Sequence, residues 1–145
     1  MTIMKVQIMI LMSFVFLQNS SEVKFGYKGK RYSFNLPSSD YEFKEAEYKE
    51  GFYKNYDFEG GARIMLHVGG NTRKPILSSK NYIIQERSDT SGVQKRQGFK
   101  GKSKNKLYWG EITICNKEIT ILFDDVKQEN LNDFIKSINS LKVNL

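Results

Sequence analysis

Acidic side chains are the groups in this sequence best suited to catalysis. A glycosidase needs only two carboxyl groups about 5 to 10 Å apart, one acting as an acid and the other as a base or nucleophile. Six acidic residues lie in two clusters that could supply such a pair: Glu42, Glu45, Glu47, Glu50, Asp124 and Asp125. The same spacing is typical of solvated acids that pair with lysines, and Asp125 could also cap a helix. A small carbohydrate-active enzyme that uses a carboxylate pair is therefore the alternative hypothesis.

Other catalytic and metal-binding patterns are missing from the sequence. It contains one histidine, His67, and one cysteine, Cys115, whereas hydrolytic triads and zinc clusters draw on several such residues. The glycine pairs at 60–61 and 69–70 lack the lysine and the spacing of a phosphate-binding loop, so turns explain them better. We expect a solvated or hydrogen-bonded His67 and a Cys115 that packs in a strand, with a reactive thiol as the alternative. We predict no enzyme activity, no cofactor and no metal.

Basic residues are concentrated in one segment that has no acidic residue from Thr90 to Gly110. If residues 99–109 are extended, the lysines at every second position from Lys100 to Lys106 project from one face, and Tyr108 continues that face. We predict that this ridge and the residues before it contact an anionic partner: Lys95, Arg96, Lys100, Lys102, Lys104, Lys106 and Tyr108. The alternative is that the lysines only protect an edge strand from aggregation, with glycines marking a turn within the segment.

The first 21 residues have the pattern of an export signal. Lys5 precedes a run of mostly apolar residues at 6–17, and polar residues follow up to Ser21. The run is shorter than the roughly 20 residues that span a bilayer, which favours a cleaved signal peptide over an anchor or a buried helix. We therefore predict a signal peptide at 1–21, cleaved near Ser20 or Ser21, and a periplasmic or secreted single domain at 22–145. Contact with a membrane is expected only through an uncleaved leader.

The formal net charge of +7 at pH 7 bears on the class of partner. A chain of this charge is drawn to anionic surfaces, so we expect an acidic protein or an anionic component of the cell envelope. Nucleic acid is disfavoured because export removes the usual target and no recognition motif is present. The oligomeric state is left open by the sequence.

Three hairpins are expected from cross-strand matches of apolar residues. In residues 23–36, a turn at 29–30 places Tyr27 opposite Tyr32 and Phe25 opposite Phe34, with the large apolar side chains on one face. A one-residue slip would destroy this match. The hairpin is thus predicted with this register.

The second and third hairpins are predicted in residues 52–70 and 107–123. In the second, a three-residue loop at 60–62 pairs Tyr56 with Leu66 and places Asn55 beside His67. In the third, a turn at 116–117 pairs Ile114 with Ile119, Ile112 with Ile121, and Gly110 with Phe123. The aromatic ring would cover the glycine, and a bulge near Gly110 would explain why the apolar parity changes there.

Two helices complete the expected elements. Residues 128–143 carry an apolar stripe at spacings of three and four, typical of an amphipathic helix that packs on a sheet: Leu131, Phe134, Ile135, Ile138 and Leu141. Residues 78–88 favour a second short helix, although alternation through Tyr82 and Ile84 also permits a strand. Residues 41–50 are expected to be extended or irregular.

These elements predict an α+β domain: a mostly antiparallel sheet of three hairpins, with the C-terminal helix and the second short helix packed on it. The stretches YSFNLP, YKNYDFEGGARIMLHV, KLYWGEITICNKEITILFDD and LNDFIKSINSLKV make the chain resemble the PsbP-like α/β/α family. That resemblance implies an exported, non-catalytic accessory or binding role and carries over no site residue. The leading hypothesis is an exported binding domain for an acidic protein or an anionic envelope component, for example an immunity protein that neutralises a toxin.

Overall fold

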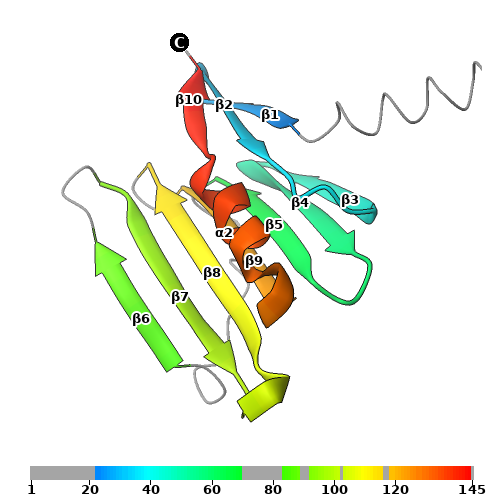
Figure 1. Cartoon of the computed structure of the whole chain (residues 1–145). Coiled ribbons are helices and arrows are strands. Elements are labelled where there is room, and N and C mark those ends of the chain that lie inside the picture. The colour runs from blue at the N-terminus through cyan, green and yellow to red at the C-terminus, as the bar shows by residue number, and fades with distance from the viewer. Residues whose placement is uncertain (1–21, 70–82, 89–91, 102, 116–117, 145) are drawn as a thin grey trace, which may run out of the picture.

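A computed structural model describes residues 22–69, 83–88, 92–101, 103–115 and 118–144, so the predicted signal peptide lies outside the described residues. Within this part of the chain, the strands form two antiparallel sheets. The smaller sheet has the order β1-β2-β10, with β1 at Glu22–Tyr27, β2 at Lys30–Asn35 and β10 at Lys142–Asn144. The larger sheet has the order β3-β4-β5-β9-β8-β7-β6. Figure 1 shows the helix lying across the larger sheet, next to the smaller sheet.

The seven strands of the larger sheet are joined mainly as hairpins. Their bounds are β3 Tyr41–Tyr48, β4 Gly51–Phe58, β5 Arg63–Val68, β6 Ile83–Ser88, β7 Gln94–Lys100, β8 Leu107–Ile114 and β9 Ile119–Lys127. Short 3-10 turns occur at Ser103–Asn105 and Gln128–Asn130, and the helix α2 spans Leu131–Asn139. Strand β9 is the central strand of this sheet. It pairs with β5 on one side and with β8 on the other, and so joins β3–β5 to β6–β8.

The core lies between the larger sheet, α2 and the smaller sheet. Phe134 of α2 is buried between the rings of Phe58 and Phe123, at centroid distances of 5.3 and 5.9 Å. From the smaller sheet, Phe34 packs against Tyr56 with ring centroids 6.4 Å apart. Each such fully buried side chain contributes about 1.5–3 kcal/mol of hydrophobic stabilisation. The helix and both sheets are therefore held together by one hydrophobic core that is rich in aromatic rings.

The end of α2 is tied to β2 by hydrogen bonds. The hydroxyl of Ser137 donates to the carbonyl oxygen of Asn35, and the Asn35 N–H donates to Ser140 Oγ at 2.7 Å. The chain then continues as β10, which pairs antiparallel with β2. The predicted helix at 128–143 is therefore shorter than expected, because its last residues are used to extend the smaller sheet.

The first predicted hairpin is confirmed, but its register differs by two residues. Phe25 pairs with Tyr32 instead of Phe34, and the turn is formed by Lys28 and Gly29. Both turn residues have positive φ, 49° and 77°, as in the type I′ turn whose twist suits a hairpin. A two-residue shift keeps every side chain on the same face, so the apolar pattern could not distinguish the two registers.

The second hairpin shows the same kind of difference. The loop has three residues as predicted, but they are 59–61, closed by a 2.8 Å hydrogen bond from the Phe58 N–H to the Ala62 carbonyl. Gly60 and Gly61 occupy the loop positions with positive φ, at 93° and 98°. Tyr56 consequently pairs with Ile64. The predicted pairing of Tyr56 with Leu66 is wrong by two residues.

The third hairpin has the predicted register. Ile112 pairs with Ile121 and Gly110 with Phe123, and the register shifts between Tyr108 and Gly110. The predicted bulge is therefore confirmed, while the turn residues 116–117 lie outside the described residues.

The predicted second helix is wrong where the structure describes it. Residues Ile83–Ser88 form strand β6, which pairs antiparallel with β7, and residues 78–82 lie outside the described part. Pairing with β7 supplies the backbone hydrogen bonds that a short helix would have made internally. Residues 41–48 took the extended alternative as β3, and the antiparallel pairs β3–β4, β6–β7 and β7–β8 add to the three expected hairpins. The general class, a mostly antiparallel α+β fold, is confirmed.

Candidate functional site

The basic segment forms a hairpin and not one continuous ridge. β7 ends at Lys100, Gly101 has a positive φ of 92°, the 3-10 turn follows, and β8 begins at Leu107. The prediction that residues 99–109 are extended is therefore wrong. The glycine permits the reversal, and pairing of β7 with β8 stabilises it. We call residues 94–114 the basic hairpin.

Three of the predicted contact residues already have partners within the hairpin or next to it. Lys100 Nζ lies 2.5 Å from Asp125 Oδ1, on the bulge of β9. The guanidinium of Arg96 lies 5.6 Å from the centre of the Trp109 ring, and Lys106 Nζ lies 4.5 Å from the centre of the Phe99 ring. Cation–π contacts of this kind leave the charge available while fixing its position.

The remaining predicted residues have different environments. Lys95 and Lys104 are exposed, the first on β7 and the second at the turn, and Lys102 lies outside the described residues. The hydroxyl of Tyr108 donates a hydrogen bond to Gln128 Oε1, which links β8 to the segment before α2. The six of these residues that the structure describes thus do not form one surface.

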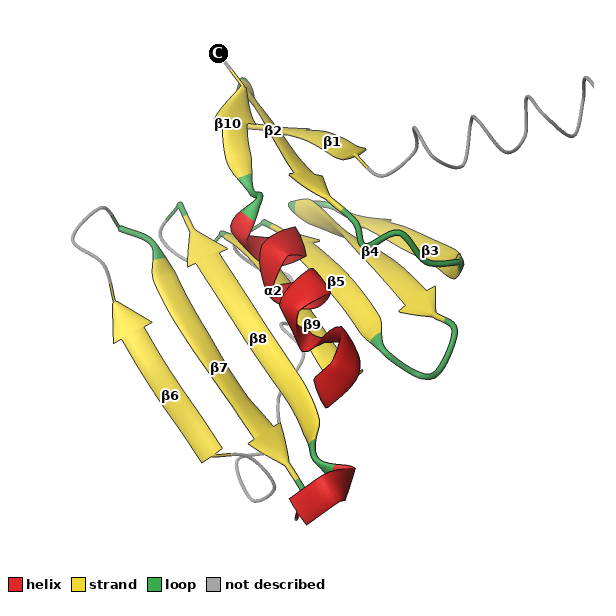
Figure 2. Cartoon of the chain, viewed as in Figure 1, coloured by secondary structure: helices red, strands yellow, loops and turns green. Residues whose placement is uncertain are grey.

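A groove lies between α2 and the strands β7 and β8. It consists of two adjoining pockets of about 200 and 260 Å³ that share Gln97, Phe123 and Ile135. The groove exists because α2 packs on β8, β9 and β2, while β6 and β7 extend beyond the helix. Figure 2 shows this uncovered part of the sheet beside the helix.

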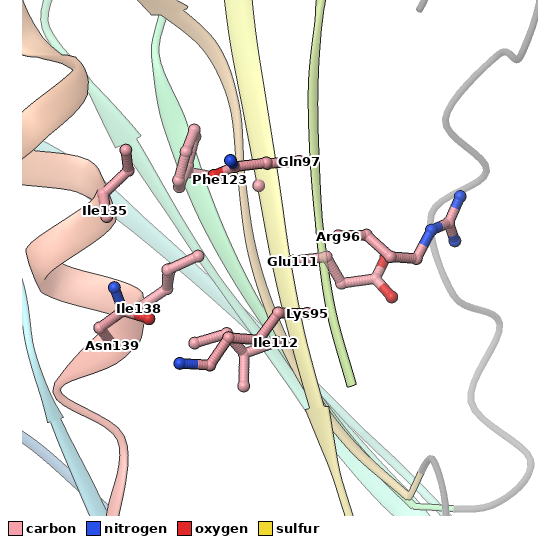
Figure 3. Close-up of a pocket in the computed structure, with 10 residues that line it drawn as sticks. Lys95, Arg96, Gln97, Glu111, Ile112, Phe123, Ile135, Ile138 and Asn139 are labelled. Carbon is pink, nitrogen blue, oxygen red and sulfur yellow. The ribbon is translucent and has the colours of Figure 1, made fainter. Parts of the chain in front are cut away.

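The pocket beside the end of α2 combines one cation with neutral polar and apolar groups. In Figure 3, the side chain of Lys95 extends towards Asn139 of α2, with Ile112 beside it and Ile138 above. Arg96 extends away from α2 in the same view. The carboxylate of Glu111 accepts a 3.0 Å hydrogen bond from Thr113 Oγ1. Glu111 and Thr113 are two residues apart on β8, so both lie on the face of the sheet that is turned away from α2. Lys95 is therefore the charged side chain on the helix side of this pocket.

The pocket beside the start of α2 is more apolar. Its lining residues are Gln97, Gly98, Phe99, Tyr108, Trp109, Phe123, Leu131 and Ile135. Lys106 stands over the ring of Phe99 at this end. The groove therefore has aliphatic and aromatic walls and a lysine near each end, an arrangement that suits an anionic ligand with apolar groups.

Sequence reasoning identified Lys95, Lys106 and Tyr108 but missed the groove as a whole. The walls of the groove come mainly from β7, β8 and α2. The groove forms where strands extend beyond the helix, and which strands do so depends on their order in the sheet. A signal was present in Gly98 and Gly110, since glycines within strands often mark close approach of another group. The predicted aromatic cover of Gly110 was that signal, and it was interpreted only as a kink.

The residues considered for catalysis do not meet at the groove. Glu42, Glu45 and Glu47 are exposed on β3, at the other side of the sheet, and Glu50 is in the β3–β4 turn. Their positions provide no enclosed site for a carboxylate pair. Within the described residues, no three His, Cys, Asp or Glu side chains are grouped so that they could hold a metal ion.

The solvated alternative for His67 is wrong, and Cys115 differs from expectation. His67 is buried, with its ring stacked on that of Tyr53 at 5.8 Å, because the shifted register places Tyr53 opposite it. Cys115 is exposed immediately after β8, with a φ of 55°, so the prediction that it packs within a strand is wrong. Its Sγ lies 3.3 Å from the hydroxyl of Tyr32. This hydrogen bond, together with burial, raises the pKa of Tyr32 from 10.0 to about 12.

The fold and the groove define the class as an antiparallel α+β domain with an open groove beside its helix. Comparison with known proteins adds no family: no protein-family model matches the chain, and no curated protein is similar enough in sequence to match. Among the described segments, no helix has the length and apolar character needed to cross a membrane.

Proposed function

We propose that this protein is an exported, non-enzymatic binding domain that holds an acidic protein segment in the groove between α2 and the basic hairpin. The observation that carries this proposal is the position of Lys95, at the polar side of a groove whose other walls are mostly apolar. Export depends on the predicted signal peptide at 1–21. A partner in the periplasm or outside the cell follows from it.

The division of the groove into two parts favours a protein segment. The two adjoining pockets measure about 200 and 260 Å³. Each has room for one or two apolar side chains. An extended or helical segment could place an apolar side chain in each pocket and carboxylates near Lys95 and Lys106.

The charge of the basic hairpin supports the same partner. Lys104 is exposed in the 3-10 turn between β7 and β8, and cations near a binding site speed the encounter with an acidic partner. Lys100 contributes less because Asp125 already neutralises it. An accessory role of the PsbP-like kind, or neutralisation of an acidic toxin by an immunity protein, would use such a surface.

A charge reversal tests the proposal. We expect Lys95→Glu to weaken binding of a short peptide of alternating glutamate and leucine by about tenfold at low salt, because it places like charges together. Lys24→Glu, at an exposed position of β1, is the matched control for net charge. Fluorescence anisotropy at two salt concentrations measures both. Equal affinities for the two variants would remove the groove as the site.

The native partner requires a separate experiment. Pull-down from the native cell envelope at low and high salt, followed by mass spectrometry, should recover an acidic protein with wild-type protein and less of it with Lys95→Glu. Recovery of anionic lipid or glycan without an acidic protein would replace the proposed partner class. The glutamates of β3 would gain a catalytic role only if glycan turnover occurs and one Glu→Gln change abolishes it.

A further inference from the structure

Strand β3 forms one edge of the larger sheet, on the side away from the basic hairpin. Figure 1 shows β3 at one end of the sheet and β6 and β7 at the other. Within the described part of the chain, β3 has β4 as its strand neighbour on one side and none on the other. An edge strand presents a row of main-chain N–H and C=O groups that can pair with an added strand.

The side chains of β3 make this edge unusual. Tyr41, Phe43 and Tyr48 are 38%, 44% and 55% exposed, and they are three of the four large hydrophobic side chains exposed in the described residues. The rings of Tyr41 and Phe43 lie 5.3 and 5.1 Å from the ring of buried Tyr56. The exposed aromatic surface is thus continuous with the core, and a strand added to β3 would extend that core.

The charge around β3 is opposite to that of the protein as a whole. Residues 40–50 contain five acidic residues and two lysines, in a chain whose formal net charge is +7. The acidic residues are Asp40, Glu42, Glu45, Glu47 and Glu50. Glu45 is close enough to the aromatic patch to act on Tyr56, whose pKa is raised first by burial and then by Tyr41 and Glu45.

Alternation along the strand determines which groups a new neighbour would contact. Tyr41, Phe43, Glu45 and Glu47 share one face of β3, because successive side chains point to opposite faces. An added strand would meet two aromatic rings at one end of this face and two carboxylates at the other. Main-chain hydrogen bonds would provide affinity, and alternate side chains would provide specificity.

We propose that the β3 edge binds an extended, basic segment of another protein by strand addition, with apolar side chains beside Tyr41 and Phe43 and basic side chains beside Glu45 and Glu47. Charge complementarity selects this occupant over an acidic segment. It also disfavours a second copy, since two chains of net charge +7 repel each other. The β3 edge and the groove lie near opposite edges of the larger sheet, so the protein could hold two partners of opposite charge.

The probe is a short peptide that carries two valines and then two lysines at every second position, separated by threonines, so that valine and lysine share one face when the peptide is extended. Its control has glutamate in place of the two lysines. We expect the basic peptide to bind and the acidic one not to bind at β3. Glu45→Lys combined with Glu47→Lys should weaken binding by about tenfold or more. Glu129→Lys combined with Asp133→Lys makes the same charge change beside α2, where both residues are exposed, and should have much less effect.

Hydrogen exchange locates the peptide. Amides of β3 should gain protection when the basic peptide binds, and those of β7 and β8 should not. Phe43→Ser is a second variant, checked for folding by circular dichroism, and it should also weaken binding because it removes an aromatic contact. The proposal is overturned if neither variant changes affinity, if protection appears elsewhere, or if β3 becomes protected by self-association without peptide. If the groove fails to bind an acidic peptide, binding of the basic peptide at β3 is still expected. The two proposals can therefore fail separately.

Discussion

The ring of Phe123 occupies the space where a side chain at Gly110 would lie. A Cβ built on Gly110 would stand 2.6 and 2.7 Å from two carbons of that ring, and 3.3 Å from Ile138 Cδ1. Gly110 and Phe123 are cross-strand partners, and both line the pocket beside Lys95. The glycine is therefore required by packing, and its absent side chain lets α2 approach β8.

The first prediction follows from this contact. Gly110→Ala should lower the free energy of unfolding by about 1–3 kcal/mol, because the ring must move within a packed core. Chemical denaturation measures the change. Gly26→Ala is the matched control, since a Cβ there would meet its nearest atom at 3.7 Å. Backbone entropy alone would make both variants slightly more stable, so equal changes in the two variants would show that contact with Phe123 does not decide the effect.

The second prediction concerns the anchor of α2. Phe134→Ala should cost about 3–5 kcal/mol of stability, because it empties the space between Phe58 and Phe123. Thermal and denaturant unfolding should both report the loss. Asn132→Ala, at an exposed position of the same helix, should change stability by at most about 0.5 kcal/mol. A small effect of Phe134→Ala would mean that α2 contributes little to the core.

The third prediction is a loss of stability at alkaline pH. The raised pKa of Tyr32, about 12 when folded against 10.0 ordinarily, means that the unfolded chain loses this proton first. The contribution is complete below pH 10 and declines as pH rises from 10 towards 12. Equilibrium unfolding measured across this range should show a steeper decline for wild-type protein than for Tyr32→Phe.

A cysteine variant separates the causes of the Tyr32 shift. The hydrogen bond with Cys115 is the larger cause and burial the second. Cys115→Ala should therefore lower the pKa of Tyr32 towards that expected from burial, as followed by tyrosinate absorbance. An unchanged titration in Cys115→Ala would show that the 3.3 Å contact does not persist in solution.

The fourth prediction concerns acid pH and the ion pair between Lys28 and Glu118. Lys28 Nζ lies 3.0 Å from a carboxylate oxygen of Glu118, which joins the β1–β2 turn to the start of β9. Lys28 lowers the pKa of Glu118, so its contribution is present above the carboxyl's ordinary pKa and is lost as pH falls through the folded value. Glu118→Gln should be slightly less stable than wild type near neutral pH and similar to it in strong acid.

Salt provides the control for this ion pair. Because the pair is exposed, its effect should be small and should weaken at high ionic strength. Thermal unfolding at low and high salt, at neutral pH, compares wild type with Glu118→Gln. A difference that persists at high salt would indicate lost packing instead of lost charge attraction.

Periodicity in the sequence determined which face each strand buries. The alternation of Phe25, Tyr32 and Phe34 identified a hairpin and its core face, because a one-residue slip would expose every apolar side chain. For the third hairpin, unlike the first, the register was also predicted correctly, including Phe123 over Gly110 and the bulge beside it. The stripe through Phe134 and Ile138 identified the helix that packs on the sheet. These features depend on near neighbours and on strong cross-strand pairs.

The three-dimensional structure decided between alternatives that fit the sequence periodicity equally well. Registers that differ by two residues bury the same side chains, so the turn at Lys28-Gly29 selected the first hairpin's register. Residues Ile83–Ser88 form a strand because they pair with the edge of β7. Lys142–Asn144 are a strand and not part of the helix because they pair with the edge of β2. The groove and the acidic edge of β3 arise from the order of the strands in the sheet. That order is set by long-range pairing, which the local sequence does not encode.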